Sequence, residues 1–232
     1  RFMLVDDDGL FISQREHASM ALMGVEQMSD QFKIFHRQNS EDCIYVKKDY
    51  RQGDAIQVQI WDDQCKAILM SDDINEWFSD TLKMNCRLVY MPDDNMRVAD
   101  PDYAPERKKV SFADAFPYLL LSTASLQQAS EKAGQTMDVS RFRPNFVVEN
   151  AIPFEEDSWR KIVIGECVFR LVKPCARCVV TTIDQQTAQK GKEPLQSMAA
   201  YRKQGNKILF GQNLIAENYG WVSTGDKVQV LD

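Results

Sequence analysis

The sequence predicts an α+β fold in which antiparallel β-structure predominates. Short runs of alternating apolar and polar residues recur along the chain, Asp/Gly turn signals separate several of them, and few segments have the apolar spacing of a helix. The chain has 232 residues, 44% of them hydrophobic and 27% charged, so it can bury a sizeable core as one large domain or two smaller ones. We expect a mainly antiparallel barrel with a few peripheral helices.

The first part of the chain is predicted to be rich in strands. Its strand-like segments are bounded by turn residues or alternate in polarity, as half-buried antiparallel strands do: residues 1–5, 10–13, 43–46, 56–61 and 86–90. One helix interrupts them. Ser71 is placed to cap it, and its apolar residues Ile74, Trp77, Phe78 and Leu82 lie at helical spacing.

A polar, proline-punctuated connection separates this part from the rest. We therefore expect an N-terminal domain over residues 1–92, a connection over 93–109 and a second domain over 110–232. The strands predicted beyond the connection are residues 116–121, 146–148, 208–210 and 227–231, with a hairpin over 162–169.

Two helices are expected in the second domain. Ser122 or Thr123 can cap a helix that runs through Lys132 and ends at Gly134, because glycine readily adopts the left-handed conformation that ends helices. Residues 193–203 have a helical pattern before a second glycine, Gly205.

The segment Lys-Pro-Cys-Ala-Arg-Cys, residues 173–178, contains the residues most suited to chemistry. The β-branched run that follows, residues 179–184, predicts a strand with Cys178 at its edge. A thiol beside a guanidinium tends to ionise, and a thiolate binds a soft metal or attacks an electrophile. Cys175 and Cys178 could instead share a zinc ion or form a redox disulfide, and both could simply be small buried apolar residues.

The composition of the chain argues against several classes of protein and of active site. The formal net charge of −6 argues against a nucleic-acid surface, and no apolar run approaches the length of a membrane helix. Six irregularly spaced cysteines and the absence of a signal-peptide pattern favour a reducing, cytoplasmic setting. With only His17 and His36, a Ser-His-Asp triad or a histidine-rich zinc site is hard to assemble. Because the chain opens on Arg1 inside an expected strand, we expect further residues upstream in the complete protein.

Four ordered motifs give a resemblance to a known family. They are residues 173–178, Thr-Thr-Ile-Asp at 181–184, Arg-Phe-Arg-Pro-Asn-Phe-Val-Val at 141–148 and Phe-Gly-Gln-Asn at 210–213. Together they resemble a MOSC domain. The N-terminal hairpin and residues 112–117 extend the likeness to bacterial relatives of the mitochondrial amidoxime-reducing component. The resemblance implies a MOSC-type β-barrel with peripheral helices, preceded by a smaller β-rich domain.

The resemblance also implies a molybdenum–pyranopterin cofactor, with the Cys178 thiolate as the protein's ligand to the metal and as its catalytic residue. The cofactor-binding residues that it implies are Arg1, Asp114, Arg143, Asn145, Arg177 and Cys178. Arg143 could alternatively form a surface ion pair, and Asp114 could be a turn former. Ala115, Phe116 and Ala176 occupy positions where relatives can have hydroxyl side chains, so backbone groups or water would replace those contacts.

The function implied is a molybdenum-dependent oxidoreductase that reduces N-hydroxylated compounds such as hydroxylaminopurines, amidoximes and hydroxylamines. Its electrons would come from a separate reductase or from a ferredoxin domain that this sequence lacks. No Cys-x4-Cys-x2-Cys run is present, so no iron–sulfur cluster is expected in this chain. An alternative is a sulfur-carrier or cofactor-delivery module with a persulfide on Cys178. A third reading is a barrel that binds no cofactor. No nucleic-acid or membrane partner is expected.

Overall fold

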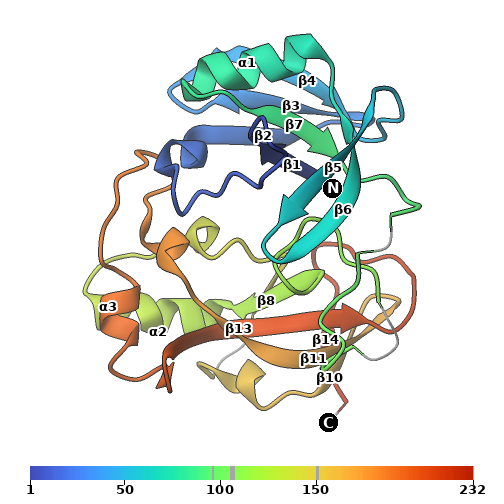
Figure 1. The fold of residues 1–232 in the computed structure, drawn as a ribbon. Coiled ribbons are helices and arrows are strands. Elements are labelled where there is room, and N and C mark those ends of the chain that lie inside the picture. Colours follow the sequence, from blue (N-terminus) through green and yellow to red (C-terminus); the bar gives the residue numbers. More distant parts are fainter. Residues whose placement is uncertain (96, 105–107, 150–151, 232) are drawn as a thin grey trace. The chain divides into compact units, whose positions relative to one another are not determined.

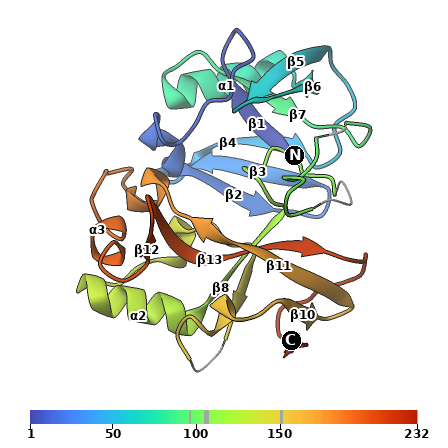
Figure 2. The same ribbon diagram turned by 60° about the horizontal axis from the view of Figure 1, so that its bottom comes forward.

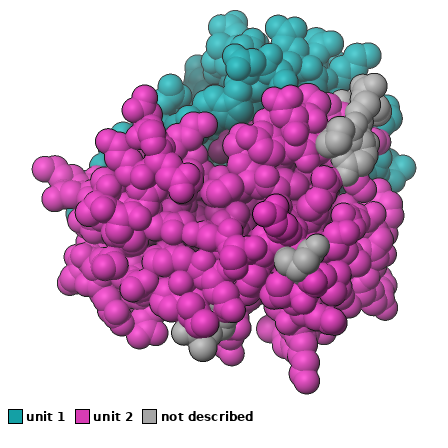
Figure 3. Space-filling model, turned by 90° about the horizontal axis from the view of Figure 1, so that it is seen from below, with its two compact units in different colours: residues 1–97, 183–190 teal, residues 98–182, 191–232 magenta. Residues whose placement is uncertain are grey.

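The computed structural model describes the chain except for residues 96, 105–107, 150–151 and 232. The chain forms two compact units, the first built from residues 1–97 and 183–190 and the second from residues 98–182 and 191–232 (Figure 3). Among the described pairs of strands, only β8 and β9 run parallel. The predicted α+β class with mainly antiparallel strands is therefore confirmed. None of the described helices has the length and apolar composition needed to cross a membrane.

The first unit contains two antiparallel sheets and one α-helix (Figure 1). The four-stranded sheet has the order β1 (Phe2–Val5), β7 (Arg87–Tyr90), β6 (Asp63–Leu69) and β5 (Ala55–Ile60). The three-stranded sheet consists of β2 (Met23–Gln27), β3 (Gln31–His36) and β4 (Asn39–Lys47), and a 3-10 turn, η1 (Ala18–Leu22), precedes it. The helix is α1 (Asp72–Leu82).

The predicted N-terminal hairpin and the predicted helix of this unit are both confirmed. The turn is closed by hydrogen bonds from Asp6 N to Leu10 O (3.0 Å) and from Gly9 N to Asp6 O (3.1 Å). The predicted apolar face of α1 is buried, and its residues Phe78 and Leu82 belong to one apolar cluster with Leu88 of β7. Ser71 is the N-cap residue, as predicted, but its side chain makes no capping hydrogen bond.

The second unit is built on a sheet with the order β14-β10-β11-β13-β8-β9, and β12 pairs with β13. Its strands are β8 (Tyr118–Ser122), β9 (Phe146–Val148), β10 (Lys161–Ile164), β11 (Cys167–Ala176), β12 (Lys203–Gln204), β13 (Lys207–Ala216) and β14 (Val228–Val230). The two long strands, β11 and β13, lie side by side and antiparallel (Figure 2). Their register shifts between Pro174 and Ala176, so β11 is irregular just before Cys178.

Helical elements surround this sheet. They are α2 (Thr123–Ala133), α3 (Leu195–Met198) and the 3-10 turns η2 (Val139–Arg141), η3 (Glu155–Asp157) and η4 (Val179–Thr182). The predicted ends of α2 are confirmed. Ser122 Oγ accepts a hydrogen bond from Ser125 N (3.1 Å), and Gly134 ends the helix with a φ of 66°. Leu120 and Leu121 of β8 belong to two different apolar clusters.

Two local predictions for the second unit were wrong. Residues 179–182 form the turn η4 rather than a strand, because Thr181 and Thr182 donate their hydroxyls to carbonyls three residues earlier in the chain. The helix expected over residues 193–203 is only Leu195–Met198. Beyond it, Lys203–Gln204 pairs with β13, and Gly205 lies in the turn between the two strands rather than at a helix end.

Candidate functional site

Cys178 follows the end of β11 and immediately precedes η4. Its carbonyl accepts hydrogen bonds from Thr181 N (3.2 Å) and from Thr181 Oγ1 (3.0 Å), and Val179 O accepts one from Thr182 Oγ1 (2.8 Å). The two threonines are 3% and 4% exposed, whereas Val179 is 42% exposed. The thiol of Cys178 is free and partly accessible. It therefore sits on a backbone segment held in place from inside the fold.

Arg177 connects this segment to two other parts of the second unit. Its backbone N–H donates to Ile208 O (2.8 Å), its Nε to Phe210 O (2.7 Å) and its Nη1 to Phe142 O (3.1 Å). The guanidinium lies over the Phe142 ring, 5.4 Å from its centroid. Each bond is to a backbone carbonyl, so the side chain fixes the spacing of three segments.

The second terminal nitrogen of Arg177, Nη2, is buried and has no hydrogen-bond partner in the described part of the chain. Burial lowers the pKa of this guanidinium, and the nearby sulfur atoms of Cys175 and Cys178 act in the opposite direction. A β-carbon on Gly211 would lie 3.3 Å from Nη2 and 2.7 Å from Leu120 O, and Gly211 has a φ of +80°. The close approach of β8 and the left-handed backbone therefore require glycine at this position, and a β-carbon there would also crowd Nη2.

Arg143 lies on the loop whose carbonyl Arg177 holds. It has a φ of +53°, an uncommon conformation for a residue with a β-carbon, and its backbone N–H donates to Ser140 O (3.2 Å). Its side chain is exposed and pairs with none of the described residues. Because η2 also contacts η4, the Arg143 loop and the Cys178 segment are neighbours.

Asn145 makes two hydrogen bonds with the backbone of Leu119 in β8. Its Oδ1 accepts from Leu119 N (2.9 Å), and its backbone N–H donates to Leu119 O (2.8 Å). No described residue accepts from its Nδ2. The side chain is thus oriented by the fold and keeps a donor for a ligand.

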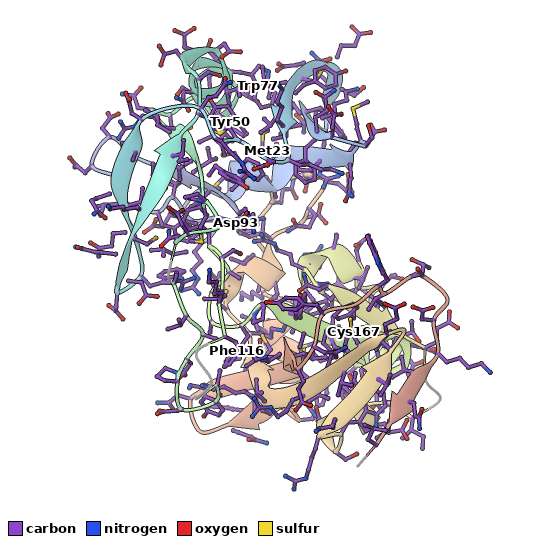
Figure 4. The ribbon with its side chains drawn as sticks, turned by 90° about the vertical axis from the view of Figure 1, so that its right-hand side faces the viewer. Met23, Tyr50, Trp77, Asp93, Phe116 and Cys167 are labelled. Atoms are coloured by element: carbon purple, nitrogen blue, oxygen red, sulfur yellow. The ribbon has the colours of Figure 1, made fainter. Side chains whose placement is uncertain are left out.

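Asp114 and Arg177 both lie within electrostatic range of Cys175. Burial raises the pKa of the Cys175 thiol. Arg177 opposes this increase, Asp114 and Cys178 add to it, and a hydrogen bond with Asn213 opposes it. Asp114 is exposed, whereas Phe116 is buried and packs on Tyr103 with ring centroids 6.0 Å apart (Figure 4). The Phe116 side chain therefore belongs to the core of the second unit.

The remaining predicted residue, Arg1, belongs to the first unit. Its Nη1 donates to Tyr90 Oη (2.9 Å), and its Nη2 forms an ion pair with Asp93, which is labelled in Figure 4. These bonds raise the pKa of Arg1. Within the second unit, the structure brings Arg177 and Cys178 next to the loop that carries Arg143 and Asn145, and Asp114 lies within electrostatic range of Cys175.

Two further residues of this site were not singled out from the sequence. Phe142 supplies both the carbonyl and the ring that hold Arg177, and it is buried. Asn213 donates from Nδ2 to Lys173 O (3.1 Å) and contacts Cys175. Phe142 lies in the motif at 141–148 and Asn213 in the motif at 210–213. These motifs were the sequence signal that could have identified the two residues.

The donor set suits a large anionic ligand together with a soft metal. Arg177 precedes Cys178 and has an unused N–H donor, and the loop that carries Arg143 and Asn145 contacts the η4 turn that follows Cys178. Within the described ranges, no three His, Cys, Asp or Glu side chains cluster as a metal site would require. A metal bound by Cys178 would therefore need further ligands from a cofactor.

Comparison with known proteins assigns the chain to a family. A model of the MOSC domain matches residues 107–229, and a model of the MOSC N-terminal beta barrel domain matches residues 1–85. The chain is 28% identical over 243 residues to mitochondrial amidoxime-reducing component 1 of Mus musculus, covering 99% of this chain and 71% of that protein.

Two other relatives are matched over smaller parts of their lengths. Mitochondrial amidoxime-reducing component 1 of Homo sapiens is 32% identical over 170 residues, which are 67% of this chain and 50% of that protein. Molybdenum cofactor sulfurase of Oryza sativa subsp. japonica is 30% identical over 191 residues, which are 75% of this chain and 22% of that protein. The chain belongs to the MOSC domain family and has the associated N-terminal β-barrel domain.

Proposed function

We propose that this protein is a molybdenum-cofactor-dependent oxidoreductase that reduces N-hydroxylated compounds to the corresponding amines. The observation that carries the proposal is the partly accessible Cys178 beside Arg177, whose Nη2 is buried and has no hydrogen-bond partner among the described residues. Two similar proteins are named as amidoxime-reducing components, which supports reduction of an N–O bond. The substrates we propose are hydroxylaminopurines, amidoximes and hydroxylamines, and the setting is cytoplasmic.

Each of the site residues is proposed to hold a different part of the cofactor. The Cys178 thiolate binds molybdenum, and the site's donors fit the anionic pterin: Arg143 grips its phosphate, and Asn145 Nδ2 and Arg177 Nη2 donate to its polar groups. We keep Asp114 as an acceptor for pterin N–H groups and Arg1 as a further contact. Since positions 115, 116 and 176 lack hydroxyls, backbone groups or water supply the corresponding contacts.

The bound cofactor supplies two-electron chemistry at the metal, and the protein supplies orientation and charge. The overall reaction is R–NHOH + 2 H⁺ + 2 e⁻ → R–NH₂ + H₂O. We assign no general acid or base to the chain, because water can deliver both protons. The electrons come from a separate donor or an attached ferredoxin domain.

A second function is favoured by the match to molybdenum cofactor sulfurase. In that case, Cys178 carries a persulfide and the protein delivers sulfur or cofactor. Mass spectrometry of the purified protein separates the two: an added sulfur atom on Cys178 indicates the carrier, and bound metal with pterin fluorescence indicates the oxidoreductase.

Replacement of each thiol in turn tests the proposal. In Cys178→Ala, we expect bound molybdenum to fall to background and reduction of 6-hydroxylaminopurine to be lost. Cys175→Ala is the matched control, because it removes a thiol from the same segment and should retain most of the metal. Wild-type levels of metal and activity in Cys178→Ala would refute the assignment.

A further inference from the structure

The two long strands of the second unit are interrupted by a bulge. Leu209 pairs with Ala176 and Gln212 pairs with Pro174, so two residues of β13 stand opposite one residue of β11. A bulge leaves residues without a partner in the ladder and lets the strand bend. The two residues of β13 without such a partner, which we call the β13 bulge, are Phe210 and Gly211.

The β13 bulge supplies a carbonyl that directs Arg177. Phe210 O accepts the hydrogen bond from Arg177 Nε (2.7 Å), and Gly211 has a φ of +80°. Phe210 is fully buried, and its ring packs on those of Phe142 and Phe154, with centroids 4.7 and 6.3 Å away. Since this carbonyl belongs to a residue outside the regular ladder, its direction depends on what holds the chain on each side of the bulge.

Asp157 of η3 connects the residues on the two sides of the β13 bulge. Its Oδ1 accepts a hydrogen bond from Gln212 Nε2 (2.7 Å), and its Oδ2 lies 2.7 Å from Arg202 Nη2. Arg202 in turn donates from Nε to Leu209 O (2.8 Å), and its own carbonyl accepts from Leu209 N (3.0 Å). One carboxylate therefore holds Gln212 directly and Leu209 through Arg202.

These bonds are partly shielded from water. The side chains of Arg202 and Asp157 are 15% and 31% exposed, and Gln212 is 3% exposed. Arg202 also lies over the ring of Phe154, which precedes η3, with its guanidinium carbon 4.4 Å from the ring centroid. Hydrogen bonds to a carboxylate are shorter and stronger than bonds between neutral groups. The contacts therefore hold η3 firmly against both sides of the bulge.

We propose that Asp157 is a positioning residue for the cofactor site. By holding both sides of the β13 bulge, it fixes the direction of Phe210 O, and this carbonyl together with Phe142 O sets the plane of the Arg177 guanidinium and the direction of its Nη2. This inference rests on the proposed function, in which Nη2 donates to the cofactor. Asp157 acts only through Arg177, because both of its carboxylate oxygens already accept from protein donors.

A purely stabilising ion pair is the alternative role for Asp157. In that case its removal would lower the stability of the fold without a particular effect on Arg177. The chain offers a matched control in Glu217, which directly follows β13. Its Oε2 lies 3.1 Å from Lys161 Nζ and its Oε1 lies 3.8 Å from Arg170 Nε, and its side chain is 34% exposed, close to the 31% of Asp157. Glu217→Ala thus removes a similar carboxylate and leaves the bulge contacts intact.

The test measures hydrogen exchange of the Arg177 Nε–H, which donates to Phe210 O. Exchange is followed by NMR on the purified full chain, and the signal is assigned by its absence in Arg177→Lys. The rate is divided by that of the backbone amides of β10 in the same sample, which corrects for any general loss of stability. Molybdenum and pterin contents are measured on the same samples.

The variants are Asp157→Ala, Asp157→Asn and the control Glu217→Ala. Asp157→Ala removes both acceptors. Asp157→Asn keeps the shape of the side chain but turns one acceptor oxygen into an NH₂ group, while both partners are donors. It carries the test if Asp157→Ala does not fold.

We expect the relative exchange rate of the Arg177 Nε–H to rise at least about tenfold in Asp157→Ala and at least about threefold in Asp157→Asn, and to stay within about twofold of wild type in Glu217→Ala. Bound molybdenum and pterin should fall in both Asp157 variants and stay at the wild-type level in the control.

Equal relative exchange in the Asp157 variants and the control, or faster exchange with wild-type cofactor content, would overturn the positioning role. A wild type that holds no molybdenum or pterin would count against the proposed function alone. The exchange rates would then still decide whether Asp157 positions Arg177.

Discussion

Arg177 and Arg143 show how two arginines of one site differ in what holds them. Arg177 donates to two backbone carbonyls and stacks on a ring, whereas the Arg143 side chain is exposed and pairs with no described residue. A guanidinium has a planar fork that an ammonium group cannot reproduce. The first side chain is therefore part of the fold, and the second is available to a ligand.

Replacement by lysine should affect stability at Arg177 and cofactor retention at Arg143. Arg177→Lys keeps the charge but loses at least one carbonyl hydrogen bond, and we expect the free energy of unfolding to fall by about 1.5–3 kcal/mol. Arg143→Lys should change it by less than about 0.5 kcal/mol while weakening cofactor retention. Urea unfolding and molybdenum analysis measure the two effects. Equal stability losses in the two variants would contradict this division of roles.

The Cys175 thiol should be less reactive at neutral pH than an ordinary thiol. Burial raises its pKa, so it stays protonated in the range where an ordinary thiol begins to ionise. Its contribution to stability is fully present below the thiol pKa of the unfolded chain and is lost as pH rises through the higher folded value.

The pH dependence of iodoacetamide labelling tests this, with the Cys175 peptide followed by mass spectrometry. We expect the labelling rate to rise at higher pH in the folded protein than in the same protein unfolded in urea. A folded-state midpoint at or below the unfolded one would show that Arg177, rather than burial, controls this thiol.

Only the site residues whose side-chain type is recognisable within a sequence motif could be predicted. Arg143, Asn145, Arg177 and Cys178 were predicted because they stand inside such motifs. Phe142 was not, because its contribution is a backbone carbonyl and a ring, and these depend on where the fold brings Arg177.

At the scale of elements, the caps of the two long helices show what local sequence can and cannot fix. Ser122 and Ser71 both occupy N-cap positions, as predicted from residue type. Only Ser122 makes the side-chain bond, and its hydroxyl also donates to Glu156 Oε2 (3.0 Å) inside the second unit. Residue type predicts the helix start, but tertiary contacts decide what the cap contributes.

The two caps therefore provide a matched pair of substitutions. Ser122→Ala removes a cap and leaves a buried carboxylate oxygen without that donor, so we expect a loss of about 2–4 kcal/mol in the free energy of unfolding. Ser71→Ala should cost less than about 0.5 kcal/mol, since its side chain makes no capping bond. Urea unfolding of both variants is the measurement, and similar losses would contradict the assigned difference.

The run at residues 179–182 shows where strand propensity fails. Val-Val-Thr-Thr favours a strand by composition, yet the threonine hydroxyls offer the backbone a competing set of hydrogen bonds, and the segment folds as η4. In α2, by contrast, the cap, the apolar spacing and the terminal glycine all agree, and the helix forms where it was predicted.

At the scale of the whole molecule, the fold class was predictable because it depends on many short alternating segments rather than on any one of them. The division into two compact units follows the matches to two family models except at residues 183–190, which belong to the first unit but lie inside the MOSC-domain match. Our domain boundaries at residues 92 and 110 stay a proposal. The chemistry was less predictable, because the thiol, two arginines and an amide come together from segments spread between residues 143 and 178.

The most direct measurement is the sulfur ligation of molybdenum in the holoprotein, determined by X-ray absorption at the metal edge. The serine variant is used because its oxygen can replace the thiolate as a metal ligand, which alanine cannot do. If Cys178 binds the metal, Cys178→Ser should have one fewer sulfur neighbour per molybdenum than the wild type, and Cys175→Ser should have the same number as the wild type. An unchanged sulfur count in Cys178→Ser, with metal still bound, would contradict the account.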